Sequence, residues 1–112
     1  MALSALTAPA VAATDGGASA QGYACSNGKF CIYSGWDGTG EVCEFIPPVA
    51  NTVDTCGFIR NSGNNVLSVR NLMGYKVQYY KGTNYGDRVG STPSNGNGNL
   101  QGNYQIRSLK RQ

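Results

Sequence analysis

The chain has 112 residues, of which 13% are charged, with nine Lys or Arg against six Asp or Glu and a formal net charge of +3. That length holds one domain, and so few charges exclude a disordered chain kept open by self-repulsion. The cations are spread along the sequence, without the basic stripe and interleaved aromatics that are typical of nucleic-acid binders. Sixteen Gly and seven Tyr are instead typical of short strands joined by tight turns.

The first 22 residues differ in composition from the rest. Residues 1–13 are apolar and Ala-rich, and Ala10-Val11-Ala12 has the small-x-small form of a signal-peptidase site. The stretch is too short to span a bilayer, which takes about 20 apolar residues, and it lacks a positive n-region. We interpret residues 1–22 as the remainder of a secretion signal, whose true start lies upstream or was assigned too late, and a flexible lead-in. A disordered Ala-rich leader is the alternative; in either case residues 23–112 are the folded domain.

Four cysteines support export to an oxidising environment, and four cysteines allow three disulfide pairings. The short loop from Cys25 to Cys31 closes naturally as a bend, which leaves Cys43 to pair with Cys56. The second bridge would enclose a loop of about 14 residues and stabilise the fold by roughly 3 kcal/mol. Free or metal-bound thiols are the alternative, but the chain has neither a CxxC pair nor a histidine. We therefore predict two disulfides, no metal and no cofactor.

Period-two patterns predict short strands, because Gly, Asn or Pro interrupts every helical period. Strands are predicted first at residues 30–33 and at residues 41–46, where polar and apolar residues alternate as in a half-buried strand. Two more are predicted at residues 66–70 and 76–80. The residues between them, Asn71 to Gly74, predict a hairpin turn with glycine at a position of positive φ.

The last third of the chain continues this pattern. Residues 88–90 predict a short edge strand, and residues 105–110 predict the strand that closes the fold. Between them, Ser94 to Asn99 (SNGNGN) is polar and glycine-rich and predicts a loop. Strands this short at this spacing indicate an all-β sandwich or barrel.

An internal repeat organises the predicted strands into two halves. Tyr33–Gly40 resembles Tyr80–Asp87, since each stretch opens on a tyrosine at a strand end and reaches a turn residue seven places on. Val66–Arg70 likewise matches Ile106–Lys110, each with a central serine. Each half is thus a strand, a glycine-rich folded turn, a loop and a strand, as in a pair of four-strand Greek keys.

Three stretches carry a family resemblance. They are Cys25–Gly35, with Cys-x5-Cys before an aromatic strand end, Ser68–Tyr80 continuing through Asn84-Tyr85-Gly86, and Asn99–Leu109. Together, across residues 25–110, they resemble the βγ-crystallin-like secreted peptidase inhibitors of the streptomycete metalloproteinase inhibitor type. The resemblance implies a βγ-crystallin-like sandwich of two Greek-key motifs and a protein that binds an extracellular protease.

The sequence departs from that family at three points. The first folded turn ends in Gly40 but the second in Asp87, and because Asp tolerates a left-handed backbone we expect the second turn to survive. Calcium-binding relatives carry hydroxyl ligands where Leu67 and Arg107 stand, so half of each ligand set is missing and we predict no calcium site. The family's reactive loop lies inside a disulfide in its second half. No cysteine follows Cys56, so that site does not carry over.

The residues available for catalysis are few. Without histidine, the Ser/His and Cys/His nucleophiles are impossible. Asp37 and Glu41 flank the first folded turn and are the nearest approach to an acid–base pair, but exposed turn carboxylates are common. We predict that the protein is not an enzyme.

The segment with the most functional promise is Glu44–Thr55 (EFIPPVANTVDT), held between Cys43 and Cys56. Its Pro-Pro pair favours an extended backbone, and the disulfide reduces the entropy lost on docking into a protease cleft. Trp36 at the tip of the first turn is a second candidate, because exposed tryptophans are enriched at binding hot spots. The predicted contact residues are Ile46, Pro47, Pro48, Val49, Ala50, Asn51 and Trp36.

Each of these assignments has a structural alternative. The alternative for segment 44–55 is an ordinary inter-strand loop whose Ile46 and Val49 cover the core, and the alternative for Trp36 is a plug at one end of the sandwich. The leading hypothesis is a secreted, monomeric protease inhibitor. The alternatives are an antimicrobial or killer-toxin-like protein that acts on microbial envelopes and a structural extracellular protein. Exposed Tyr and Lys clustered at residues 75–88 would favour the envelope, and an ordered, protruding 44–55 loop would favour the inhibitor.

Overall fold

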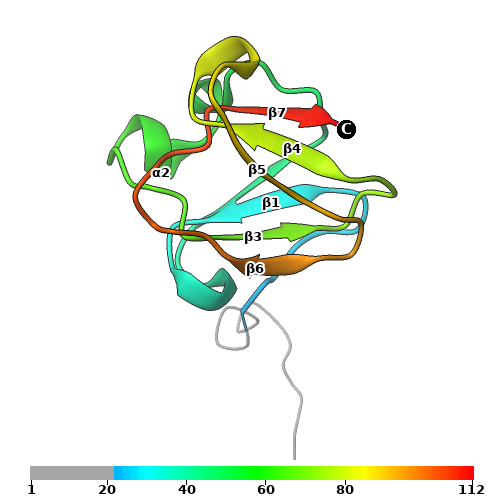
Figure 1. Ribbon diagram of the computed structural model, residues 1–112. Helices are drawn as coiled ribbons and strands as arrows, with labels where there is room; N and C mark the ends of the chain where they lie inside the picture. Colours follow the sequence, from blue (N-terminus) through cyan, green and yellow to red (C-terminus); the bar gives the residue numbers. More distant parts are fainter. Residues whose placement is uncertain (1–21) are drawn as a thin grey trace, which may run out of the picture.

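The computed structural model of this protein describes residues 22–112, which form two antiparallel sheets joined by short helical turns (Figure 1). This is the all-β fold with two disulfides that the sequence predicts. Of the predicted secretion signal and lead-in, residues 1–22, all but Gly22 lie outside the described residues, so that assignment stays a prediction.

Seven strands and four short helical turns make up the described part. The strands are β1 (Phe30–Tyr33), β2 (Val42–Phe45), β3 (Ser68–Asn71), β4 (Val77–Tyr80), β5 (Arg88–Thr92), β6 (Asn97–Asn99) and β7 (Ser108–Arg111). The helical turns are η2 (Trp36–Gly38), η3 (Thr52–Asp54), α2 (Gly57–Arg60) and η4 (Thr83–Tyr85). Sheet A has the strand order β2-β1-β3-β6, and sheet B has the order β5-β4-β7.

Each sheet contains a contribution from both halves of the chain. The strand β6 belongs to the second half but pairs with β3 in sheet A, with Ser68 opposite Asn99. In return, Val49 of the first half forms an antiparallel bridge with Leu109 of β7 in sheet B. The Greek-key path of each half remains an interpretation of this strand order.

The hydrophobic core lies between the two sheets and is closed at one side by α2. Burial of these side chains is the main favourable contribution to folding. The core side chains are Phe30, Ile32, Phe45, Cys56, Phe58, Ile59, Val66, Val69, Val77, Tyr79, Ile106 and Leu109.

The first folded turn, η2, is held by left-handed residues and a buried serine. Asp37 and Gly40 have φ values of 55° and 79°. From β3, the Ser68 hydroxyl donates to the Gly35 carbonyl at 2.7 Å and accepts from the Gly38 amide at 2.8 Å. The turn therefore folds back onto sheet A, where its backbone polar groups are satisfied.

The second folded turn, η4, repeats this geometry. Asn84 and Asp87 have φ values of 54° and 57°, which confirms that the turn survives with Asp in place of Gly. From β7, the Ser108 hydroxyl donates to the Gly82 carbonyl at 2.6 Å and accepts from the Tyr85 amide at 3.0 Å. The sequence repeat is therefore a structural repeat.

The predicted hairpin at residues 71–74 is wrong. The strands before and after it lie in different sheets, so the segment crosses the sandwich, and Gly74 does not have a positive φ. The buried Asn71 side chain organises this crossing, since it donates to the carbonyls of Tyr75 and Thr92 at 2.9 and 2.8 Å and accepts from the Met73 amide at 2.8 Å. The Asn71 side chain thus makes hydrogen bonds that backbone groups would make in a hairpin.

Two further expectations also differ from the structure. Ser94–Asn99 was expected to be a loop, but Asn97–Asn99 forms β6, because β3 supplies the backbone partners that local composition does not indicate. The short helix α2 was not expected, and it places Phe58 and Ile59 in the core. The predicted strands 66–70 and 105–110 begin two and three residues later, at Ser68 and Ser108.

Candidate functional site

Segment 44–55 leaves the edge strand β2 and returns to the fold at Cys56. The disulfide pairings are those predicted, Cys43 with Cys56 and Cys25 with Cys31. The segment runs past β7 in the upper part of the molecule (Figure 1). The Cys43–Cys56 disulfide therefore links the two ends of the segment, joining β2 of sheet A to the residue that precedes α2.

Hydrogen bonds also anchor the segment to the second half of the chain. The Val49 amide and carbonyl each bond to Leu109, at 2.9 Å. The amide of the fully buried Thr52 donates to the Arg107 carbonyl at 2.9 Å. The Ala50 carbonyl accepts from the Asn84 amide at 2.8 Å. Segment 44–55 is therefore ordered along its length, although it is docked on β7 rather than protruding.

Side chains along this segment alternate between exposed and covered. Ile46, at 58% exposure, is the most exposed large apolar residue of the described chain, and Pro48 and Ala50 are exposed after it. Pro47 is buried, and Val49 is half-buried and packs against the core. Of the six predicted contact residues in this segment, those at even positions face solvent. The alternative that Ile46 covers the core is excluded, while Val49 does cover it.

The Pro-Pro pair does not give an extended backbone. The peptide bond between Pro47 and Pro48 is cis, and the chain bends at Pro47. The next residues regain a strand-like path through the Val49–Leu109 bridge. Asn51 then ends the segment, because its side-chain oxygen accepts from the Val53 amide at 3.1 Å and so begins η3. The Asn51 side chain therefore serves to stabilise the fold and is not a free contact for a partner.

The strand β2 continues this exposed surface and was not singled out from the sequence. It is an edge strand of sheet A, and Val42 is 41% exposed beside Glu44 and Ile46. The register places Phe45 opposite Phe30 with its side chain in the core, so side chains at even positions point outward. This surface could have been predicted from the sequence, because Val42, Glu44 and Ile46 are alternate residues and therefore lie on the same face of the strand.

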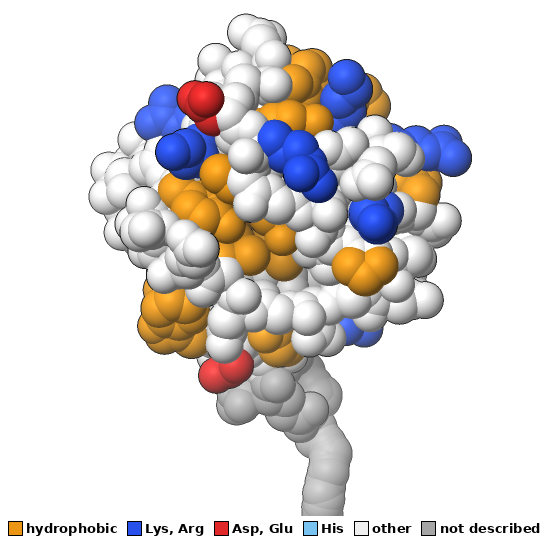
Figure 2. Space-filling model, in the orientation of Figure 1, with side chains coloured by type: hydrophobic (Ala, Val, Ile, Leu, Met, Phe, Trp, Pro, Cys, Tyr) orange, Lys and Arg blue, Asp and Glu red, His pale blue; other side chains and the backbone are white. Residues whose placement is uncertain are grey.

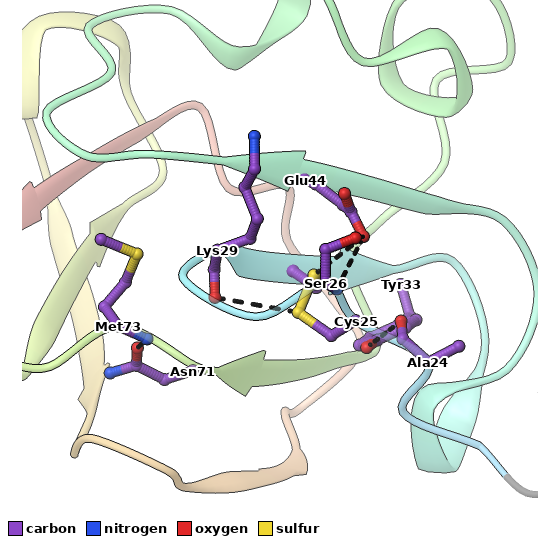
Figure 3. Close-up of a disulfide and its surroundings, with 9 residues drawn as sticks. Ala24, Cys25, Ser26, Lys29, Tyr33, Glu44, Asn71 and Met73 are labelled. Atoms are coloured by element: carbon purple, nitrogen blue, oxygen red, sulfur yellow. Dashed lines mark hydrogen bonds between the residues drawn. A yellow bond between two sulfur atoms is a disulfide. The ribbon is translucent and has the colours of Figure 1, made fainter.

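Glu44 is held against the first disulfide loop. One of its carboxylate oxygens accepts from the Ser26 amide at 3.0 Å and from the Ser26 hydroxyl at 2.9 Å (Figure 3). Nearby, the Tyr33 hydroxyl donates to the Ala24 carbonyl at 2.7 Å. Burial raises the pKa of Tyr33 far above its ordinary value of 10.0, because the buried side chain disfavours the charged phenolate. These bonds fix the 25–31 loop against sheet A.

Trp36 begins the first folded turn, η2, which packs on β1, β3 and β6 of sheet A, whereas segment 44–55 bonds to β7 of sheet B. Its side chain is 47% exposed, and its ring rests on Gly102, where a Cβ atom would collide with it. The neighbouring Asp37 and Asn99 exchange two hydrogen bonds, which tie the turn to β6. Trp36 is thus partly packed and partly free, and the structure does not bring it together with Ile46.

Metal-binding chemistry has little support in the described part of the chain. Within residues 22–112 one group of potential ligands gathers, Cys25, Cys31 and Glu44, but both sulfur atoms are consumed by the disulfide. At the positions considered for calcium, Leu67 is half-buried, and the Arg107 side chain donates to Gln105 at 2.8 Å. The prediction that calcium does not bind rests on these two residues.

Comparison with known proteins gives one match. No curated protein matches the chain. The model of peptidase inhibitor family I36, however, matches residues 18–92 of the 112. That range includes both disulfides, both folded turns and all of segment 44–55, and it ends at the last residue of β5. The chain therefore belongs to peptidase inhibitor family I36.

Proposed function

We propose that this protein is a secreted, monomeric inhibitor of an extracellular protease, and that Ile46, Pro48 and Ala50 enter the protease cleft. Membership of a peptidase inhibitor family supports a protease as the partner. The observation that carries the choice of surface is the anchored segment with the exposed Ile46 side chain at its start. The predicted contacts Pro47, Val49 and Asn51 then act as supports for it.

Preorganisation is the physical reason for choosing this segment. Ordering a free loop costs roughly 1–2 kcal/mol of backbone entropy per residue. Here the Cys43–Cys56 disulfide and the bonds from Val49 and Thr52 to β7 and its preceding residues hold the backbone before any partner arrives. More of the interaction energy is then available for binding.

The edge of β2 offers a second element of recognition. The Ser34 amide donates to the Glu41 carbonyl at 3.0 Å, which sets the alternation of the antiparallel ladder. The backbone groups of Val42 and Glu44 therefore point away from β1. Edges of this kind bind extended peptides by adding a strand, so the β2 edge can pair with the rim of a protease cleft while Ile46 fills a pocket.

Localisation and protease class are part of the proposal. Two formed disulfides are typical of an oxidising, extracellular environment. Within residues 22–112 no helix has the length and apolar character needed to cross a membrane. We propose a metalloprotease as the first target class to test, on the family resemblance, and residues 23–112 as the mature domain.

Screening the purified protein against metallo-, serine and cysteine proteases tests the function. Inhibition constants of variants then test the surface: Ile46→Asp should weaken inhibition by about 30-fold, because a central apolar anchor contributes about 2 kcal/mol or more. Lys29→Gln is a control outside the segment. If Trp36→Ala abolishes inhibition and Ile46→Asp does not, the contact surface is the first folded turn, and our choice of segment is wrong.

Val49→Asp separates binding from folding. Because Val49 packs against the core, an Asp there should lower the free energy of unfolding. Ile46→Asp should leave the free energy of unfolding nearly unchanged, because the side chain is exposed. Urea unfolding of both variants distinguishes loss of a contact residue from loss of the fold.

A further inference from the structure

The charges of this protein divide unevenly between its two halves. Residues 22–71 carry three cations and four anions, whereas residues 72–112 carry six cations and a single anion, Asp87. The six cations are Lys76, Lys81, Arg88, Arg107, Lys110 and Arg111. In Figure 2 the Lys and Arg side chains gather on the upper part of the molecule, where sheet B lies. Spread along the sequence, these charges converge in the folded protein.

Strand alternation places several of them on one face. Val77, Tyr79 and Leu109 point into the core, so the side chains that alternate with them on β4 and β7 point to the outer face of sheet B. Gln78 and Lys110 are cross-strand partners on that face. Lys76 precedes Val77 on β4 and therefore has the same outward orientation.

Arg88 completes this surface from β5. Its Nε donates to the Gln78 side-chain oxygen at 2.6 Å, so Arg88, Gln78 and Lys110 form a row across the three strands. The Lys110 Nζ lies 5.2 Å from the centre of the Tyr85 ring. These contacts orient the cations through neutral groups and leave their charge available for an anionic ligand.

The aromatic side chains of this face are already engaged. Tyr80 is buried, and the Tyr85 ring packs edge-on against it at 5.8 Å between ring centres. Neither offers an open platform on which a base could stack, as binders of single-stranded nucleic acid require. Of the exposed Tyr and Lys whose clustering at residues 75–88 would favour a microbial envelope as the target, Lys76 and Lys81 are exposed and the tyrosines are not.

This face also lacks an exposed large apolar side chain of the kind that protein partners bury in an interface. The exposed large apolar side chains of residues 22–112 are Trp36, Val42 and Ile46, all in the first half. Protein interfaces draw most of their energy from such anchors. A row of exposed, oriented cations without one suits a flexible polymer with repeated negative charges, whose binding comes from charge neutralisation and counterion release.

We propose that the outer face of sheet B, formed by Lys76, Arg88 and Lys110, binds a linear anionic polysaccharide. This binding uses other side chains than protease inhibition. Segment 44–55 bonds to the outer edge of β7 through Val49, whereas Arg88 lies on β5, at the opposite edge of sheet B. A secreted inhibitor with such a face would be retained on a surface that carries the polymer. Both activities would then operate in one molecule.

The test measures binding of dextran sulfate by titration calorimetry at several salt concentrations, with neutral dextran as the blank. The double variant Arg88→Gln/Lys110→Gln should bind dextran sulfate about tenfold more weakly, with a shallower dependence of affinity on salt. The matched control, Lys29→Gln/Arg60→Gln, removes the same charge outside this face and should lose less than about twofold. Equal losses from both double variants, or no loss from the first, would overturn the proposal.

Two competitors decide the class of ligand. Poly-L-glutamate and single-stranded DNA should each bind more weakly than dextran sulfate at equal charge concentration. Stronger binding of poly-L-glutamate would assign the face to an acidic protein, and stronger binding of DNA would assign it to nucleic acid; either would overturn the proposal. Inhibition constants of the single variant Arg88→Gln should be unchanged, because β5 lies at the edge of sheet B opposite the one that bonds to segment 44–55, which keeps this test independent of the inhibitory surface.

Discussion

The two halves of the domain build the same folded turn and cover it with different groups. In the first half, the Tyr23 amide donates to the Gly38 carbonyl at 2.9 Å, and Tyr23 lies so close that a Cβ on Gly38 would collide with its backbone. In the second half, the matching position is Tyr85, whose ring packs against Tyr80. The backbone scheme is therefore common to both turns, and the covering group is not.

The halves also differ in what holds them to the rest of the fold. Both disulfides lie in the first half, whereas the second half has none. In the second half, long cationic side chains lie over tyrosine rings instead, with Arg111 at 4.4 Å from the ring centre of Tyr75 and Lys110 over Tyr85. Both halves therefore build the same turn on a buried serine, while the surrounding segments are linked by disulfides in the first half and by packing in the second. The following predictions test each contribution separately.

The largest expected effect comes from the covalent link. Replacing Cys43 and Cys56 together by Ala should lower the free energy of unfolding by about 3 kcal/mol, because the bridge restricts a long loop in the unfolded chain. The same change at Cys25 and Cys31 should cost about 2 kcal/mol, since that loop is shorter. Urea unfolding of the two variants gives the comparison. A greater loss at Cys25 and Cys31 would mean that the 25–31 loop contributes more to stability than segment 44–55.

The contact between Tyr23 and Gly38 gives the next effect. Gly38→Ala should lower the free energy of unfolding by about 2 kcal/mol, because Gly38 has a φ of 70° and no room for a side chain. Gly74→Ala is the control, because a Cβ there meets nothing within 4 Å. Thermal unfolding measures both. If Gly38→Ala behaves like the control, Tyr23 does not restrict the first turn.

The buried serines test whether the two turns are equivalent. Ser68→Ala and Ser108→Ala each leave one amide and one carbonyl of a turn without a partner, so each should cost about 1–2 kcal/mol in unfolding free energy. Ser34→Ala, at a half-buried side chain that bonds only the Glu41 amide, should cost less. Chemical unfolding at one pH compares the three. Clearly unequal losses for Ser68 and Ser108 would show that packing, and not the serine, holds one of the turns.

The smallest effect concerns the last residue of each turn. Asp87→Gly should raise the unfolding free energy by about 0.5 kcal/mol, because glycine adopts the left-handed backbone of this exposed position without a steric penalty. The reverse change, Gly40→Asp, should lower it, since a Cβ there comes close to the Ser34 hydroxyl. Calorimetric melting temperatures measure both changes. A lower melting temperature for Asp87→Gly would mean that the Asp87 side chain stabilises its turn.

The features that were predicted from sequence are largely local. The two disulfide pairs follow from cysteine spacing, and the turn ending in Asp87 follows from the tolerance of Asp for a left-handed backbone. Strands β1, β2 and β4 lie within the predicted ranges. Each depends on residues close together in the chain, so pattern and spacing are sufficient.

The errors come from pairings between residues far apart in sequence. Ser94–Asn99 has loop composition, and only the backbone of β3 makes its last residues a strand. Val49 is turned toward the core by its bridge to Leu109, which no local pattern indicates. For the candidate site, the disulfide that links the ends of segment 44–55 was therefore predictable from the sequence. That Ile46 is exposed and Val49 is covered could be seen only in the folded structure.

The exchange of segments between the sheets has a consequence for how the molecule holds together. Because β6 completes sheet A and Val49 bonds to β7 in sheet B, a cut between the halves near Gly74 would leave each fragment with an unsatisfied sheet edge. We therefore expect neither fragment to fold alone, although each carries a full copy of the repeat. The sequence repeat thus describes a single folded unit. The surface around Ile46 and the cationic face of sheet B both belong to that unit, so unfolding of either half should remove both surfaces.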